Sequence, residues 1–234
     1  MPASQPITHP LVTQVQEQLR LLTRGVTVPK IVIGLSGGPD SVFLFHALLP
    51  LHIAGELVLH AAHLNHGWRT DADDDAIFCA KLATSNGIPF HLGHLHEILP
   101  TLSSHKQKES SPEARARHCR RAFFQNVLTS HQLDFVILAH HRDDQIATFL
   151  LRLIRGTSLS GLCGMQPRAG IYLRPMLAVS KSDLLAVLKE FHRIYCSDAT
   201  NQDTRFLRNS VTKKLLPAFD SCDKRSRNAI ERTM

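Results

Sequence analysis

Apolar and polar positions alternate along the chain in two patterns, one typical of buried β-strands and the other typical of amphipathic helices. Short apolar runs rich in branched residues predict five strands, and segments with helical spacing of their apolar positions lie between them. The predicted strands are Ile31–Leu35, Leu57–Leu64, Pro89–Leu92, Phe135–Ala139 and Ile171–Arg174. The predicted helices are Pro10–Leu22, Ser41–Leu49, Asp71–Ala83, Glu113–Leu128, Asp143–Ile154, Lys181–Phe191 and Thr204–Leu216.

This order of strands and helices predicts an α/β fold, with a doubly wound, mainly parallel sheet and helices on both faces. Two segments depart from the pattern. Residues Glu97–Ser111 are polar and predict an irregular loop beside the active site, and Ser221–Met234 has the pattern of the opening of another helix. Ligands bind such sheets beyond the carboxyl ends of the strands, so polar residues that follow a strand are the first candidates for a site.

Composition limits the class of protein. With 234 residues, of which 43% are hydrophobic, the chain can form one large domain, or one domain and part of a second. No apolar run reaches the length of a membrane span, and Met1–Gln14 lacks the pattern of a secretory signal, so we expect a cytoplasmic protein without a membrane partner. The five cysteines include no C-x-x-C pair, which argues against a disulfide framework or a cysteine-based zinc site.

The formal net charge of +7 is concentrated in two segments. Asn201–Met234 contains eight Lys and Arg against four acids, and His105–Arg121 contains six against two. Basic clusters of this kind favour a polyanion partner, although a solvated helix face has the same composition. Charge alone does not separate tRNA, rRNA and DNA.

The turn that follows the first predicted strand is the strongest candidate for a binding site. It consists of Ser36, Gly37, Gly38, Pro39, Asp40 and Ser41, and a helical pattern begins directly after it. Unpaired backbone N–H groups and the positive end of a helix dipole favour phosphate, and glycines let the backbone approach an anion closely. Asp40 is a candidate metal contact, because it would repel phosphate without a cation between them. The turn matches neither the Walker A nor the dinucleotide-binding glycine pattern.

Two further strand ends carry polar groups. Asn65 and His66 follow the second strand, where an adenine edge or ribose would lie. The fourth strand leads into His140, with Asp143 and Asp144 shortly after it. One of these acids can cap the next helix while the other binds Mg²⁺ together with Asp40, and His140 can orient or deprotonate a nucleophile. Capping without any further role is the alternative explanation for these residues.

Two basic segments complete the set of candidates. Arg117, Arg120, Arg121 and Phe124 fall close to one stripe of the helix Glu113–Leu128, where arginines can grip phosphate. The mixed segment that contains Arg208 precedes the last predicted helix, and it is a candidate clamp for a nucleotide or an RNA. An amphipathic basic helix and a capping loop are the simpler interpretations.

The motif SGGPDS resembles the pyrophosphate-binding loop of the N-type ATP pyrophosphatases, or PP-loop proteins. The segments HLNHGWR, EARARHCRRAFF, LAHHRDDQ, SGLCGM, RPML and FLRN, in this order, resemble the tRNA(Ile)-lysidine synthetase family, and the similarity extends over Lys30–Phe219. This resemblance implies an adenine nucleotide α-hydrolase-like fold. It also implies ligation of free lysine to the wobble cytidine of the CAU anticodon of isoleucine tRNA, through an adenylated base, with release of pyrophosphate and AMP.

We expect residues 1–28 to form an N-terminal helix, 29–219 the PP-loop domain, and 220–234 the start of a C-terminal segment. The resemblance assigns Asp40 and Asp144 to Mg²⁺ or catalysis, Arg120 and Arg208 to phosphate or adenylate contacts, and Ser36–Ser41 to pyrophosphate. From their positions after strands, we assign His140 to catalysis and Asn65 and His66 to ATP. Ala147 stands where relatives usually have a glutamate. The oligomeric state stays open, with a homodimer among the options.

Three other functions share the loop. A tRNA thiolase would use it to activate a base for sulfur, although such relatives usually carry C-x-x-C pairs that this chain lacks. A pyrophosphatase-type synthetase acting on a small metabolite would not need the basic C-terminal segment. A nucleotide sensor of the same fold would bind ATP without turnover.

Overall fold

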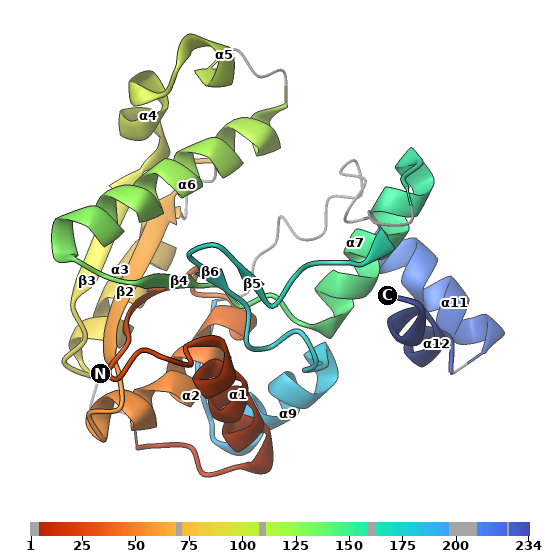
Figure 1. Ribbon diagram of the computed structural model, residues 1–234, viewed down its shortest axis with the longest axis horizontal. Coiled ribbons are helices and arrows are strands. Elements are labelled where there is room, and N and C mark those ends of the chain that lie inside the picture. Colours follow the sequence, from red (N-terminus) through yellow and green to blue (C-terminus); the bar gives the residue numbers. More distant parts are fainter. Residues whose placement is uncertain (1–4, 69–71, 108–110, 159–161, 197–209, 224) are drawn as a thin grey trace.

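The computed structural model describes residues 5–68, 72–107, 111–158, 162–196, 210–223 and 225–234. Its centre is one six-stranded sheet with the order β3-β2-β1-β4-β6-β5 (Figure 1). The strands are β1 (Lys30–Gly34), β2 (Val58–Asn65), β3 (Phe90–His94), β4 (Phe135–Ile137), β5 (Arg168–Ala169) and β6 (Tyr172–Leu173). All neighbours pair in parallel except β5 and β6, which form an antiparallel edge pair. The predicted α/β class and parallel sheet are therefore confirmed, while β5 was not predicted.

One face of the sheet is covered by four helices, whose buried apolar side chains form one core with it. They are α1 (Pro10–Leu22), α2 (Pro39–Ile53), α3 (Ala72–Thr84) and α9 (Lys181–Glu190). The core on this side is the largest in the molecule and includes Phe43, Phe45 and Leu48 of α2, all fully buried. Because α2 is apolar nearly all round, it lies between the sheet and helices α1 and α9.

The other face is covered by α6 (Pro112–His131), which runs across β1, β2 and β4 (Figure 1). Phe123 and Phe124 of α6 pack into a second core beneath it. The expectation of an irregular loop over Glu97–Ser111 was wrong for much of this segment. It contains part of α4 (Leu95–Ile98), the 3₁₀ turn η1 (Leu99–Thr101) and α5 (Ser104–Gln107), because Leu95, Ile98, Leu99 and Leu102 supply an apolar contact to the second core.

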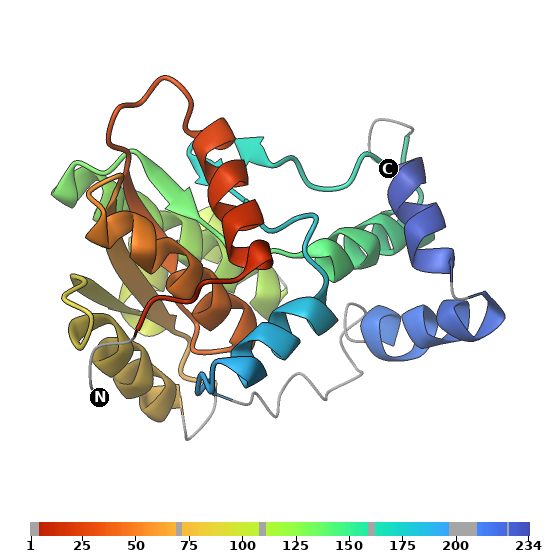
Figure 2. The ribbon, with the colours of Figure 1, turned by 90° about the horizontal axis from the view of Figure 1, so that it is seen from below.

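The C-terminal part packs beside α7 (Arg142–Arg155), away from the sheet, in both ribbon views (Figures 1 and 2). It comprises the π-helical turn η3 (Val211–Leu215), α11 (Leu216–Cys222) and α12 (Ser226–Thr233). A small third core joins Ile146, Phe149 and Leu150 of α7 to Val211 and Leu216. The helix expected at Thr204–Leu216 thus continues to Cys222, and its first residues lie outside the described part of the chain.

Strands β1, β2, β3 and β4 point the same way, so their carboxyl ends meet at one edge of the sheet. The turn before α2, the end of β2 and the segment between β4 and α7 converge there. Among the helices that the structure describes, none has both the length and the apolar character that a bilayer crossing requires.

Candidate active site

A cavity of about 480 Å³ opens at this edge of the sheet, between the turn before α2 and helix α6. Its walls contain eight of the residues expected from the sequence: Ser36, Asp40, Ser41, Asn65, His66, Arg120, His140 and Asp144. These side chains come from four separate parts of the chain and meet because the parallel strands end together. Phe124, which the sequence analysis placed on the same stripe as Arg120, also lines the cavity, as do His63 and Trp68, which it did not select.

The turn between β1 and α2 is held by its own serines. The hydroxyl of Ser41 accepts a hydrogen bond from the backbone N–H of Ser36 at 3.1 Å and donates one to the carbonyl of Gly38 at 3.0 Å. Gly38 caps α2 with extended backbone, and Pro39 is the first helical residue, a position where its missing N–H costs nothing. The first-turn N–H groups of α2 therefore face the cavity end of the helix with no side-chain cap from Gly38.

Gly37 is buried at the tightest point of this turn. Its φ is +83°, a conformation that other residues adopt only with strain. A Cβ atom here would lie 3.2 Å from the Sγ of Cys196 and 3.4 Å from the Sγ of Cys79. The carbonyl of Gly37 also accepts a hydrogen bond of 2.9 Å from the N–H of Cys196. The dihedral angle favours glycine, and the Sγ of Cys196 leaves little room for a side chain.

Two basic side chains, Lys181 and His141, contact the carboxylates of the site. The ammonium group of Lys181 donates a hydrogen bond to Oδ1 of Asp40. The Nε2 atom of His141 lies 3.5 Å from Oδ1 of Asp40 and 3.5 Å from Oδ2 of Asp144. The imidazole of His141 thus bridges the two acids that the sequence analysis assigned to metal or catalysis.

The pKa values of this cluster shift in opposite directions. Burial lowers the pKa of His141, but its hydrogen bond to Asp40 and the charges of Asp144 and Asp40 outweigh burial and hold it above its ordinary value. Burial raises the pKa of Asp40, but contact with His141 and the charge of Lys181 bring it below its usual range. Each shift favours the charged form of its group relative to the group's ordinary behaviour.

The sequence analysis expected one of Asp143 and Asp144 to cap the helix and the other to face the site, but Asp144 does both. Asp144 lines the cavity and also caps α7, because its Oδ2 accepts the backbone N–H of His141 at 3.1 Å. Asp143 is buried, accepts the N–H of Lys181 at 2.9 Å, and receives a hydrogen bond from the guanidinium of Arg227 on α12. One acid therefore both caps the helix and faces the site, and the other joins three helices.

The opposite wall is formed by α6 and the end of β2. The guanidinium of Arg120 donates to Nε2 of His66 at 3.2 Å, so His66 carries its proton on Nδ1. Burial and the charge of Arg120 lower the pKa of His66 to about 4. The ring of His66 stacks on Trp68 with 5.0 Å between centroids, and 57% of Trp68 is exposed. This wall combines a cation with an open aromatic face.

Asn65 supports the turn after β2 instead of pointing only at a ligand. Its amide donates to Asp73 at 2.6 Å, and its oxygen accepts the N–H of Gly67 at 2.8 Å. These bonds occupy both ends of the side chain, so the direct contact to adenine expected for Asn65 would require it to exchange partners.

Two of the expected arginines are not among the described residues that line the cavity. Arg208 belongs to the segment outside the described residues. Arg121 does not share the stripe of Arg120. It lies over the ring of Tyr172 at 5.8 Å and lines a second hollow with Lys106 and His118. Adjacent residues on a helix point about 100° apart, which is why the two arginines face different surfaces.

Sequence reasoning did not select Lys181 or His141 for the site. Lys181 is the first residue of α9, where a positive charge opposes the helix dipole. A cation at that unfavourable position was a usable signal for a partner of opposite charge. His140 lines the cavity and the adjacent His141 bridges the two acids. Nothing in the sequence spacing indicated which of the two histidines has which position.

The donor set of the site fits Mg²⁺. Asp40 and Asp144 supply hard carboxylate oxygens beside the phosphate-type turn, and Mg²⁺ in proteins is commonly held by one or two carboxylates together with substrate phosphates. No cysteine lines the cavity within the described residues, so soft metal ions have no thiolate ligand there. Lys181 competes for the same oxygen of Asp40.

Comparison with known proteins identifies the family. Residues 11–219 match the family model of the PP-loop domain, which is most of the chain. The chain belongs to the PP-loop family. The turn Ser36–Ser41 is thus its PP-loop, and the resemblance inferred from SGGPDS is confirmed.

Among curated proteins, the chain is similar to tRNA(Ile)-lysidine synthases. The chain is 35% identical over 218 residues to a tRNA(Ile)-lysidine synthase from Parabacteroides distasonis, covering 93% of this chain and 47% of that protein. It is 34% identical over 202 residues to a tRNA(Ile)-lysidine synthase from Bacillus subtilis, covering 84% of this chain and 41% of that protein. The PP-loop chain therefore spans less than half the length of these relatives.

Solved structures confirm the fold. The U34-tRNA thiolase NcsA from Methanococcus maripaludis superposes with a TM-score of 0.74 at 19% identity, covering 95% of this chain and 76% of that one. The ammonia-dependent NAD synthetase from Campylobacter jejuni superposes with a TM-score of 0.55 at 15% identity, covering 96% and 95%. At these identities the likeness supports the adenine nucleotide α-hydrolase-like fold alone.

Proposed function

We propose that this chain is the catalytic part of a ligase that joins free lysine to the wobble cytidine of the CAU anticodon of isoleucine tRNA. The observation that carries the proposal is the cavity in which the PP-loop, Asp40, Asp144 and Arg120 converge. The similarity to tRNA(Ile)-lysidine synthases from several bacteria supports the choice of substrate. Its proposed substrates are ATP, lysine and tRNA. Because the tRNA is in the cytoplasm, we propose that the enzyme acts there.

In the first step the carbonyl oxygen of the cytidine attacks the α-phosphate of ATP, and pyrophosphate leaves. We place the β- and γ-phosphates on the PP-loop, where the N–H groups at the start of α2 are directed. Asp40 and Asp144 would hold Mg²⁺, whose chemistry when bound is the neutralisation of charge on the departing pyrophosphate. Arg120 and Lys181 add positive charge on either side of the cavity.

Trp68 and His66 form the proposed platform for the base of ATP or of the tRNA. Their rings stack together, and Trp68 is more than half exposed. An open aromatic face of this kind binds nucleobases without regard to sequence.

In the second step the amine of lysine attacks the activated ring carbon, and AMP leaves. An amine with an ordinary pKa near 10.4 is mostly protonated at neutral pH, so a base must accept a proton. His141 is a poor candidate, because the flanking carboxylates favour its protonated form. His140 and Asp144 line the cavity and are the proposed bases.

The decisive experiment measures pyrophosphate release with ATP, lysine and a CAU-bearing tRNA transcript, each omitted in turn. Release should require ATP and tRNA, and the tRNA should gain the mass of one lysine less one water. A sulfur-for-oxygen change would instead identify a thiolase, and turnover without tRNA would identify a small-molecule synthetase.

Binding of ATP can be followed separately through Trp68, the single tryptophan of the chain. Titration with ATP should change its fluorescence. Asp40→Asn should keep this response but lose pyrophosphate release, whereas Asp74→Asn, an exposed acid on α3, should retain both. A fluorescence response without turnover in the parent protein would favour the nucleotide sensor.

A further inference from the structure

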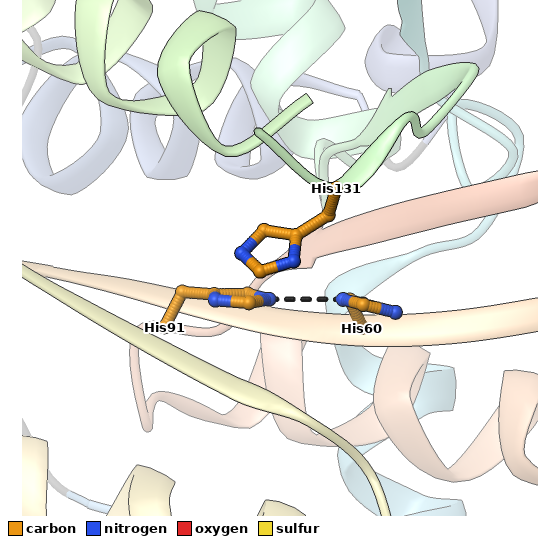
Figure 3. Close-up of side chains that lie close together, drawn as sticks. All are labelled: His60, His91 and His131. Carbon is orange, nitrogen blue, oxygen red and sulfur yellow. Dashed lines mark hydrogen bonds between the residues drawn. The ribbon is translucent and has the colours of Figure 1, made fainter. Parts of the chain in front are cut away.

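Three histidines cluster at the opposite end of the elements that carry the active site. His60 lies on β2, His91 on the adjacent strand β3, and His131 is the last residue of α6 (Figure 3). Ligand nitrogens from the three rings all lie within 4.8 Å of one another, and no other group of three metal-binding side chains this close occurs in the described residues. Neither the PP-loop nor the proposed chemistry uses them.

We infer that His60, His91 and His131 form a binding site for a divalent transition metal ion, with Zn²⁺ as the best-fitting ion and water as its fourth ligand. Imidazole nitrogen is a preferred ligand of Zn²⁺, and three histidines with one open position are an established ligand set for it. The inference is independent of the proposed ligase function.

The two strand histidines already have nearly the nitrogen spacing of a zinc site. Nδ1 of His60 and Nε2 of His91 are 2.9 Å apart and share one hydrogen bond, drawn as the dashed line in Figure 3. In a tetrahedral zinc site with Zn–N bonds of about 2.05 Å, two ligand nitrogens lie about 3.3 Å apart. The two rings must therefore separate by a few tenths of an ångström. The proton between them can move to the far nitrogen of its own ring, which frees both lone pairs.

His131 closes the cluster from the helix. Its ring centroid is 4.3 Å from that of His91 and 5.6 Å from that of His60, and Figure 3 shows it over the other two rings. His131 is exposed while the two strand histidines are half-buried, so the ion would have protein on one side and solvent on the other. That arrangement leaves room for the water ligand.

The crowding of three imidazoles also favours their neutral forms. Burial and the rings of His131 and His60 lower the pKa of His91 to about 4. Burial, His131 and His52 lower the pKa of His60. Neutral imidazole is the form that binds metal ions.

A metal ion here would join α6 to two strands. The cluster lies five residues before Asn65 along β2 and eleven residues after Arg120 along α6. Both paths correspond to about 16 Å, so the ion would be well separated from the active site. Its expected effect is stabilisation of the contact between α6 and the sheet.

The test uses the full chain, purified without a histidine tag and stripped with a chelator. Zn²⁺ is titrated in competition with a chromophoric chelator, and Co²⁺ is added separately to report coordination through its visible spectrum. We expect one tight site per chain, a tetrahedral Co²⁺ spectrum, and a melting temperature that rises with Zn²⁺.

His131→Gln is the main variant, because an exposed residue at a helix end is replaced without disturbing the core. It should lower the affinity for Zn²⁺ at least about tenfold, and His60→Gln should do the same. His96→Gln, with a side chain 79% exposed and outside the cluster, is the matched control and should bind as the parent does. Equal Zn²⁺ affinity in the parent and His131→Gln would overturn the site, as would loss of binding in the control.

Discussion

Lys181 donates a hydrogen bond from its ammonium group to Oδ1 of Asp40, although the two residues are 141 positions apart in the sequence. The contact joins the first turn of α9 to the PP-loop end of α2. Because Asp40 is the proposed Mg²⁺ contact, the lysine sets the charge of the site before any substrate arrives. The pair also explains why a cation is tolerated at the start of a helix, where the dipole opposes it.

Removal of this charge should impair the first step of the reaction. Lys181→Met should lower the rate of pyrophosphate release by about 10²–10³-fold, the usual loss for one oriented donor in an active site. Lys181→Arg should restore part of the rate. Lys189→Met, an exposed lysine on the same helix, is the control and should react like the parent. Full activity of Lys181→Met in single-turnover assays would remove the residue from the mechanism.

Gly37→Ala should separate backbone strain from crowding in the PP-loop. The substitution introduces a side chain at φ +83° and places its Cβ 3.2 Å from the Sγ of Cys196. Gly25→Ala is the matched control, since it has φ +95° with nothing within 4 Å. Strain alone costs about 1–3 kcal/mol, so both variants should lose this much in urea unfolding. Gly37→Ala should lose more, and it should also weaken binding of ATP. An equal loss of unfolding free energy in the two variants would show that the Cys196 and Cys79 sulfurs move aside without cost.

The ion pair of His141 and Asp40 makes stability depend on pH. The pKa of His141 is raised, so its contribution is complete below the ordinary value near 6.5 and is lost as pH rises through the folded-state pKa. The pKa of Asp40 is lowered, so its contribution is complete above its ordinary value and is lost as pH falls through the folded-state pKa. Both contributions are present between those limits.

His141→Gln should therefore cost more at pH 6 than at pH 9. A hydrogen bond to a charged group contributes about 1.5–3 kcal/mol, which is the loss expected at pH 6. The measurement is urea unfolding of parent and variant at both pH values. His96→Gln provides the comparison, because its exposed ring should change stability little at either pH. A loss for His141→Gln that is the same at pH 6 and pH 9 would contradict a charged imidazole.

Arg227 should control how firmly α12 is attached. Its guanidinium donates to Asp143 on α7 and to Asp220 on α11, and the pKa of Arg227 is raised, first by its hydrogen bond to Asp220. Arg227→Leu leaves buried Asp143 without this donor, so amide exchange in α12 should accelerate by about one order of magnitude or more. Arg225→Leu removes a fully exposed pair with Asp223 and should leave exchange unchanged. Unaltered protection in Arg227→Leu would mean that apolar packing alone holds the helix.

The sequence predicted the parallel sheet well because its signals are local. Apolar runs such as Ile31–Leu35 mark buried strands, and the SGGPDS turn marks the junction of strand and helix. The edge strand β5 was missed, because two residues, Arg168 and Ala169, carry no periodicity. The irregular loop predicted over Glu97–Ser111 was wrong for residues 97–107, because short helices held against α6 by a few apolar side chains look polar in sequence.

Most candidate residues were found from their positions after strands, since the fold brings such ends together. What the sequence did not reveal were partners from distant elements. Lys181 meets Asp40, and Arg227 meets Asp143, only after the helices have packed. Arg120 and Arg121 likewise lie on different surfaces of α6. Which surface faces the cavity depends on how α6 is rotated about its axis against the core, and the sequence spacing does not reveal that rotation.

The third apolar cluster, which joins α7 to Val211 and Leu216, is separate from the two larger cores on either face of the sheet. Such a satellite can melt by itself, as a cooperative unit of lower stability than the body of the fold. Since α7 begins with Asp143 and Asp144, and Asp144 lines the candidate active site, this opening would disorganise that site while the strands stayed intact. Activity should then fade on warming before the sheet unfolds.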